Sequence, residues 1–203
     1  MAGMAAVATT LILLVLVREV LVCVHNWREY FVVHDYLAGT ATDEDVEAVD
    51  SEAITTMGSL PLTLLAIAAP GAAFLAWLWR ARVNSELMGG ADGHRRSRNW
   101  VVGSWISPVI NLWYPRRIVS DIWRTSAPRR PVSVALINAW WASFVLVGLV
   151  RPLQWRTASD WDSEHDVLVN ANLSALLTGS LLVAGALIIL IIRRITTWQT
   201  PTP

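Results

Sequence analysis

The chain has 203 residues, 54% of them hydrophobic, and only 16% carry a charged side chain. Soluble domains carry roughly 25% charged residues, so this composition excludes an ordinary soluble globular domain. The net charge is zero, but the charges are segregated: ten of the sixteen arginines lie between Arg80 and Arg130, among only three acids. The single cysteine, Cys23, excludes an intramolecular disulfide.

The first apolar stretch covers residues 5–24 and predicts a membrane span, because about 20 apolar residues cross a bilayer as a helix. We expect this helix to continue to about Leu37. Ionisable residues within a span are costly and are site candidates by default. Three such candidates are Arg18, Glu19 and His25. The alternative is that Arg18 reaches the membrane interface and pairs locally.

The stretch Thr40–Glu52 holds six carboxylates and no basic residue, which predicts a solvated loop or a short helix. Residues 60–79 predict the second span. This helix should run on to Met88 and end at Gly89 and Gly90, because glycine is the usual residue just past a helix.

The apolar, tryptophan-rich segment that follows, residues 99–114, is too short to cross a bilayer. Pro108 interrupts it, so we expect two short pieces that fold back as a re-entrant or interfacial cytoplasmic hairpin. Residues 115–125 then predict an amphipathic helix in the interface plane. Its apolar and basic faces include Ile118, Ile122, Trp123, Arg116 and Arg117.

Residues 132–150 and 173–192 predict the third and fourth spans. The third contains the polar residue Asn138, and Arg151-Pro152 is expected to close it. The sequence thus predicts an all-α integral membrane protein, a four-helix bundle that forms one domain over residues 1–203.

Arginine placement predicts the topology, because cytoplasmic loops are enriched in basic residues. The Arg-rich segment 80–131 should be cytoplasmic, and so should both termini. The acidic loops, residues 34–58 and 151–171, should lie outside the cell. We therefore expect a multi-pass protein of the plasma membrane.

Several residues at fixed spacings agree with one family. Trp77, Arg80 and Asn84 end the second span, and the stretch 100–115 follows with Trp105, Pro108, Asn111 and Leu112. The chain therefore resembles the bacterial membrane family called domain of unknown function 4328, which is common in actinobacteria. Asn99 departs from the proline expected before Trp100. The resemblance implies an architecture and no known activity.

Eight residues of these motifs could surround one polar pocket at the cytoplasmic face: Trp77, Arg80, Asn84, Trp100, Trp105, Pro108, Asn111 and Pro115. Arg80 and Asn84 are four apart and share a helix face. We expect Asn111 within hydrogen-bond reach of one of them, directly or through a water. The pocket would then be an anion or headgroup site, since arginine suits phosphate, or a purely structural cluster that satisfies freed backbone groups.

The sequence contains no G-x-S-x-G, H-E-x-x-H or P-loop motif. We therefore predict no catalytic residue, no cofactor and no metal site, and no nucleic-acid partner, because the positive-inside rule explains the arginines. The favoured function is a non-enzymatic membrane module whose Arg-rich face binds lipid headgroups, a protein partner or a second copy. The alternatives are a small transporter or channel component using Arg18, Glu19, His25 and Asn138, and a membrane enzyme acting on a lipid-borne substrate.

Overall fold

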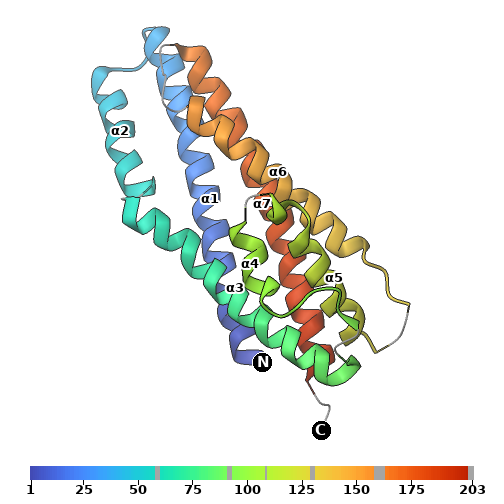
Figure 1. Cartoon of the computed structure of the whole chain (residues 1–203). Helices are drawn as coiled ribbons and strands as arrows, with labels where there is room; N and C mark the ends of the chain where they lie inside the picture. Colours follow the sequence, from blue (N-terminus) through green and yellow to red (C-terminus); the bar gives the residue numbers. More distant parts are fainter. Residues whose placement is uncertain (58–59, 91–92, 108, 129–130, 158–162, 201–203) are drawn as a thin grey trace. The chain divides into compact units, whose positions relative to one another are not determined.

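The computed structural model describes residues 1–57, 60–90, 93–107, 109–128, 131–157 and 163–200, except for the side chains of 54–57 and 60. All regular secondary structure in these residues is helical, which confirms the predicted all-α class (Figure 1). The elements are α1 (Ala2–Leu37), α2 (Asp43–Met57), α3 (Leu60–Gly89), α4 (Trp100–Ile106), the 3-10 helix η2 (Ile110–Leu112), α5 (Tyr114–Ser126), α6 (Ala135–Thr157) and α7 (Glu164–Gln199).

Four of the described helices, α1, α3, α6 and α7, are long and apolar enough to cross a membrane. The helices α1 and α7 have 36 residues each. At 1.5 Å per residue each is about 54 Å long, which exceeds the roughly 30 Å hydrocarbon core of a bilayer. Both helices can therefore cross a membrane and continue beyond it, as the sequence predicts for the first of them.

The acidic stretch after α1 forms the helix α2, the second of the two alternatives that the sequence left open. A reciprocal cap begins it: the backbone N–H of Thr42 donates to Asp45 Oδ2 at 2.8 Å, and the backbone N–H of Asp45 donates to Thr42 Oγ1 at 3.4 Å. This is the geometry of a capping box. Three acids in the first turn also favour a helix, because they complement the positive end of its dipole.

Glycine and proline differ in how reliably they end the long helices of this chain. Gly90 has φ +79° directly after α3, a conformation that glycine adopts without a Cβ penalty, so α3 ends where the sequence predicts. For α6, the sequence led us to expect an end at Pro152. This expectation is wrong, because α6 runs on to Thr157 with Pro152 inside it. A proline removes its own N–H bond but leaves the bonds on both sides of it in place.

The central segment breaks into two pieces, α4 and η2. Ser107 follows α4 with φ −82° and ψ +114°, which is the extended conformation that a residue before proline prefers. Pro108 itself lies outside the described residues. After η2, α5 begins at Tyr114 with Pro115 in its first turn, where a missing N–H costs nothing.

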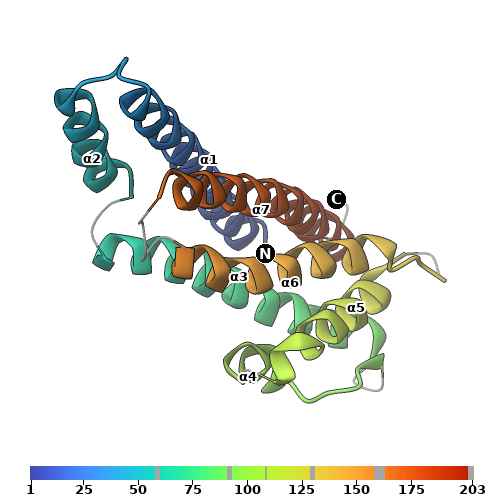
Figure 2. The ribbon, with the colours of Figure 1, turned by 90° about the horizontal axis from the view of Figure 1, so that it is seen from above.

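The described chain forms two compact units, and each has its own interior. Unit 1 consists of Met1–Leu13, Ala68–Val145 and Val183–Pro203, and unit 2 of Leu14–Ile67 and Leu146–Leu182. Unit 1 has an apolar core to which α1, α3, α4, α5, α6 and α7 all contribute (Figure 2). Its largest fully buried side chains include Trp77, Leu78, Ile118, Ile122, Trp123, Ile191 and Ile192.

Unit 2 has a different interior, because most of its buried side chains are polar. They are Glu19, His25, Asn26, Glu29, Gln154, Asn170, Ser174 and Thr178. Its buried hydrophobic residues are fewer than those of unit 1 and smaller on average. They are Leu16, Val49, Val150, Val167, Ala171 and Leu177. Polar side chains therefore dominate the interior of helices whose composition is strongly apolar.

The core of unit 1 depends on α5, and a truncation there tests this. Ile122 is 0% exposed, so Ile122→Ala should lower the free energy of unfolding by about 2–5 kcal/mol through lost burial and a cavity. Ile106 on α4 is 76% exposed, and Ile106→Ala is the matched control. Thermal unfolding of both full-length variants in detergent measures the difference. Equal melting temperatures would contradict the assigned core.

Candidate functional site

The helix α5 presents its apolar face to the core of unit 1. Ile118, Val119 and Ile122 are buried there together with Trp123. The indole Nε1–H of Trp123 donates to the carbonyl oxygen of Ser133 at 3.0 Å, and its ring meets the Trp198 ring edge-on at 4.6 Å. These contacts fix the rotation of α5 about its own axis and so decide which side chains face outward.

The basic side chains of α5 lie on its other face. Arg117 and Arg124 are exposed. Arg116 donates from Nε to Asn138 Oδ1 at 2.9 Å. The polar residue that the sequence placed inside the third span lies in α6, as expected, and there it positions an arginine. Asn138 belongs to unit 1, whereas Arg18, Glu19 and His25 belong to unit 2.

The two described acids of unit 1 are both held by arginines. Glu86 accepts from Arg82 Nε at 2.7 Å and from Arg98 Nε at 2.6 Å. Asp121, 4% exposed, accepts from the backbone N–H of Arg95 at 3.2 Å, and the Arg95 guanidinium lies 3.6 Å away.

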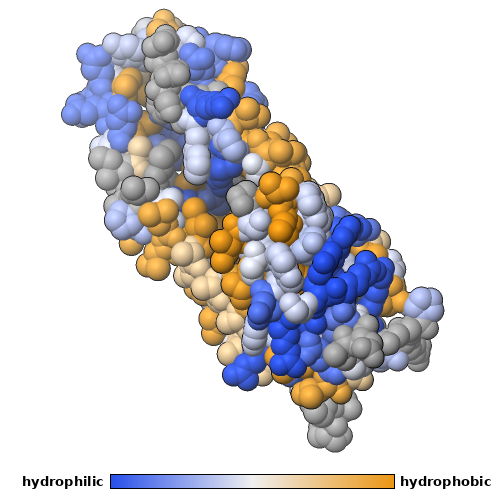
Figure 3. Space-filling model, in the orientation of Figure 1, coloured by the Kyte–Doolittle hydropathy of each residue, from blue (hydrophilic) through white to orange (hydrophobic). Residues whose placement is uncertain are grey.

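These pairs hold the segment before α4 against α3 and α5. They also neutralise the two described carboxylates of unit 1. The described part of unit 1 is therefore strongly positive. It holds Arg80, Arg82, Arg95, Arg96, Arg98, Arg116, Arg117, Arg124, Arg193 and Arg194. The surface over α5 and the segment before α4 is correspondingly hydrophilic, visible as the blue area at the lower right of Figure 3.

Gly93 and His94 dock this segment onto α5 and α3. A Cβ at Gly93 would lie 2.6 Å from Thr125 Cγ2, so only glycine fits that approach. His94 Nε2 lies 3.1 Å from Ser85 Oγ. Because Ser85 Oγ donates to the carbonyl oxygen of Arg82 at 2.8 Å, it accepts from His94, which places the imidazole proton on Nε2.

The imidazole of His94 sits in surroundings that disfavour its charged form. Its Nδ1 is buried without a hydrogen-bond partner among the described residues. Burial, and after it the charge of Arg82, lowers the pKa of His94 below its ordinary value of 6.5. Sequence analysis missed this residue, because an isolated histidine in a polar loop carries no spacing signal.

Of the eight residues expected around one pocket, the seven that the structure describes lie in several environments of unit 1. Trp77 is buried and donates from Nε1 to Thr196 Oγ1 at 3.1 Å, whereas Arg80, one turn on, is exposed. Trp100 meets the Tyr114 ring edge-on at 5.1 Å. Pro115 is buried at the start of α5, and Pro108 lies outside the described residues.

Trp105 and Asn111 each have a buried polar side-chain atom without a hydrogen-bond partner among the described residues. Trp105 lies among Phe74, Trp140, Trp141 and Phe144 at centroid distances of 5.6–6.5 Å, and its buried Nε1 has no hydrogen-bond partner in the described part of the chain. Asn111 Oδ1 is likewise buried without a partner among the described residues, so it accepts no direct hydrogen bond from the half-buried Asn84 or from Arg80. The break near Asn111 is tied down instead by Trp141, whose Nε1 donates to the carbonyl oxygen of Leu112 at 2.9 Å.

Unit 2 brings Arg18 and Glu19 into one network. Arg18 donates to Glu19 Oε1 at 2.9 Å and to Thr63 Oγ1 at 3.3 Å. Arg151 donates to Glu19 Oε2 at 2.8 Å, and Thr178 Oγ1 donates to the carbonyl oxygen of Glu19 at 3.2 Å. The carboxylate of Glu19 is thus paired on both oxygens, as a buried charge requires. Sequence analysis missed Arg151, because it assigned that residue to the end of the third span.

These features define the class: an all-α membrane protein with four membrane-length helices and an arginine-rich unit. The model of the family described as "Domain of unknown function (DUF4328)" matches residues 39–197. The chain therefore belongs to that family, as its motifs suggested. No curated protein and no solved structure matches the chain significantly.

The docking of His94 predicts a pH dependence of stability. An unfolded chain with an ordinary imidazole binds a proton at a higher pH than the folded chain does, so the free energy of unfolding falls as the pH drops below about 6.5 toward the lowered pKa. His94→Gln, which keeps an N–H donor for Ser85, should flatten this loss. The control is His165→Gln, at an exposed histidine of α7. Melting temperatures across this range measure the effect, and identical profiles for wild type and His94→Gln would contradict it.

Proposed function

We propose that the protein is a non-enzymatic membrane module whose arginine-rich unit binds anionic lipid headgroups. The observation that carries this proposal is the charge balance of unit 1, where both described acids are already paired with arginines. Arg80, Arg117 and Arg124 remain exposed. Arginine forms bidentate hydrogen bonds with phosphate, and an anionic leaflet attracts such clusters.

Exposed apolar residues in the same unit support membrane contact. Ile106, Val109, Leu112 and Trp113 are all exposed around the break between α4 and η2. Apolar side chains beside arginines match an interfacial element, whose apolar part enters the headgroup boundary while its basic part meets the phosphates. We propose on this basis that the α4–η2 segment is the re-entrant or interfacial hairpin expected from the sequence.

The proposed setting is the plasma membrane of an actinobacterial cell, with both termini and unit 1's arginine-rich surface on the cytoplasmic side. The support is the segregation of charge: α2 begins with three acids, whereas the arginines gather between α3 and α6. The positive-inside rule assigns these two regions to opposite sides of the membrane.

One observation favours the transporter or channel alternative, namely the polar interior of unit 2. Glu19, His25 and Glu29 are ionisable and buried in a helix of membrane length. Such residues often mark ion or proton pathways. The lipid-binding proposal concerns unit 1 alone, so the two are not exclusive.

Lipid enrichment tests the proposed function. Full-length protein in nanodiscs of mixed phosphatidylcholine and phosphatidylglycerol should retain phosphatidylglycerol preferentially after extraction into detergent, and quantitative lipid mass spectrometry measures the ratio. Because each arginine at an anionic surface contributes on the order of 1 kcal/mol, Arg117→Gln should lower the enrichment by about fivefold. The matched control is Arg156→Gln, an exposed arginine of unit 2. No preference in the wild type, or equal losses in both variants, would contradict the proposal.

Cysteine labelling tests the proposed orientation. In a Cys23→Ser background, a membrane-impermeant maleimide applied to whole cells should modify Asp45→Cys and spare Ser97→Cys, because these exposed positions lie in the acidic and basic regions respectively. Both should react after the cells are opened. Modification of Ser97→Cys alone in intact cells would reverse the orientation.

A further inference from the structure

The polar interior of unit 2 contains a part that its ion pairs do not explain. Four buried side-chain atoms of this unit have no hydrogen-bond partner among the described residues: His25 Nε2, Asn26 Oδ1, Glu29 Oε2 and Asn170 Oδ1. An unpaired buried polar atom costs the desolvation free energy of that group. In contrast to the paired carboxylate of Glu19, these atoms need an explanation.

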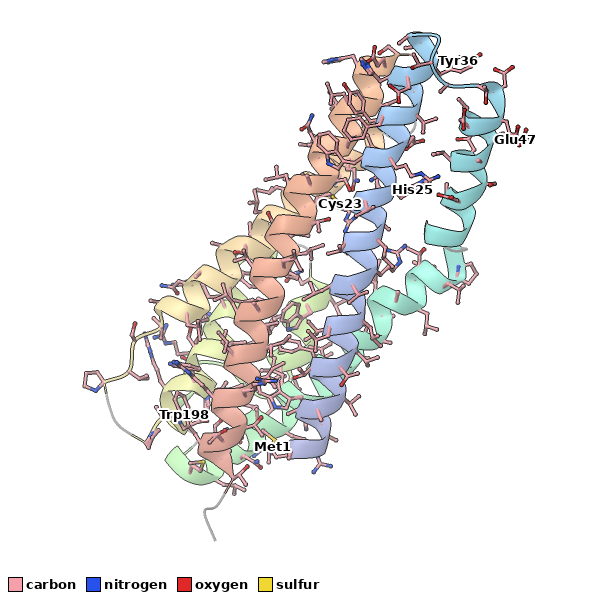
Figure 4. All side chains as sticks on the ribbon, turned by 180° about the vertical axis from the view of Figure 1, so that it is seen from behind. Met1, Cys23, His25, Tyr36, Glu47 and Trp198 are labelled. Carbon is pink, nitrogen blue, oxygen red and sulfur yellow. The ribbon has the colours of Figure 1, made fainter. Side chains whose placement is uncertain are left out.

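His25 and Glu29 share one face of α1 because they are four residues apart, although no hydrogen bond joins His25 Nε2 to Glu29 Oε2. Each residue is only 5% exposed. In Figure 4 His25 lies on the side of α1 that faces α2. Asp50 on α2 acts electrostatically on both residues, and Glu52 acts on His25.

The charges around the pair are mostly negative. On α2, Asp50 and Glu52 face it, and Arg28 on α1 is ion-paired with Glu52. On α7, the buried Asn170 is neutral. The register of α1 against α7 follows from two contacts, Thr178 with Glu19 and Glu164 with His34 at 2.7 Å.

Three other charged side chains along α1 and its neighbours already have ion-pair partners. Glu164 is paired with His34, and Arg18 and Arg151 are paired with Glu19. A carboxylate at Glu29 would carry a buried charge with one oxygen that receives no hydrogen bond. Burial of such a charge without a partner is unfavourable, and adding a proton removes the cost.

We propose that His25 and Glu29 form a proton-binding site in unit 2, in which one exchangeable proton is held either by the carboxyl group or by the imidazole. The proton comes from water, adds to Glu29 Oε2 or to His25 Nε2, and returns to water when the pH rises, with no other bond made or broken. A metal ion fits less well, because the described residues contain no group of three His, Cys, Asp or Glu side chains placed to hold one.

The proposed pair differs in kind from the arginine-rich surface, and this inference does not rest on the lipid-binding proposal. A buried site that gains and loses a proton gives unit 2 two charge states at one place. Buried ionisable residues in membrane helices commonly serve in this way as steps of a proton relay.

Infrared difference spectroscopy of the full-length protein in lipid bilayers tests the site. Acidification from alkaline pH should produce the C=O stretch of a protonated carboxyl group, shifted as expected for a buried acid. Glu29→Gln should abolish this band, because it replaces the titrating group with a neutral side chain of the same shape. The matched control is Glu47→Gln, at an exposed acid of α2 (Figure 4), which should leave the band in place.

A second variant tests whether His25 takes part in the site or Glu29 acts alone. His25→Gln should keep the band of Glu29 but move its pH midpoint, since the partner group is gone. Melting temperatures at neutral pH check that each variant folds, and Glu29→Gln should be at least as stable as the wild type because it mimics the protonated form. A band that survives Glu29→Gln, or a midpoint that His25→Gln leaves unchanged, would overturn the proposal.

Discussion

The burial of the apolar face of α5 is the interaction on which unit 1 depends. This 13-residue helix is too short to cross a bilayer, and its buried residues pack with side chains from α3, α6 and α7 in one core. Polar contacts reach the same helix from three sides: Ser126 accepts from Gln199 Nε2 at 2.6 Å, Asp121 holds the segment before α4, and Trp123 bonds to the chain before α6. The position of α5 therefore fixes where the arginines of its other face can be.

Only some of the arginines of unit 1 form ion pairs with its described acids. The ion pairs of Glu86 and Asp121 lie on arginines of α3 and of the segment before α4, where they fasten one piece of chain to another. Arg96 lies 4.5 Å from the Tyr114 ring centroid, a cation–π arrangement that also serves packing. Within the part of the chain that the structure describes, no acid or aromatic ring pairs with Arg117 or Arg124. In the proposed function, these two arginines would contact the anionic lipid surface.

The two units solve the problem of burial in different ways. Unit 1 buries tryptophan and isoleucine, so its stability comes from the removal of apolar surface and from close packing. Unit 2 buries carboxylates, amides and an imidazole, while many of its apolar side chains, such as Leu14, Leu65 and Leu149, are exposed. In a bilayer that arrangement is favourable, because lipid accepts the apolar exterior and polar groups pair inside.

The sequence by itself determined the helical class, the membrane-length helices, the end of α3 at Gly90 and the amphipathic α5, because each follows from local hydrophobic periodicity or from the conformational preference of one residue. The family motifs were also legible, since their spacings are local. Only the tertiary structure decided which arginines are paired, that Asn138 holds Arg116, that Arg151 meets Glu19, and that no direct hydrogen bond joins Asn111 to Asn84. Those partners are separated by as many as 132 residues, and a side chain's partner across such a distance is set by how helices pack, which local sequence does not encode.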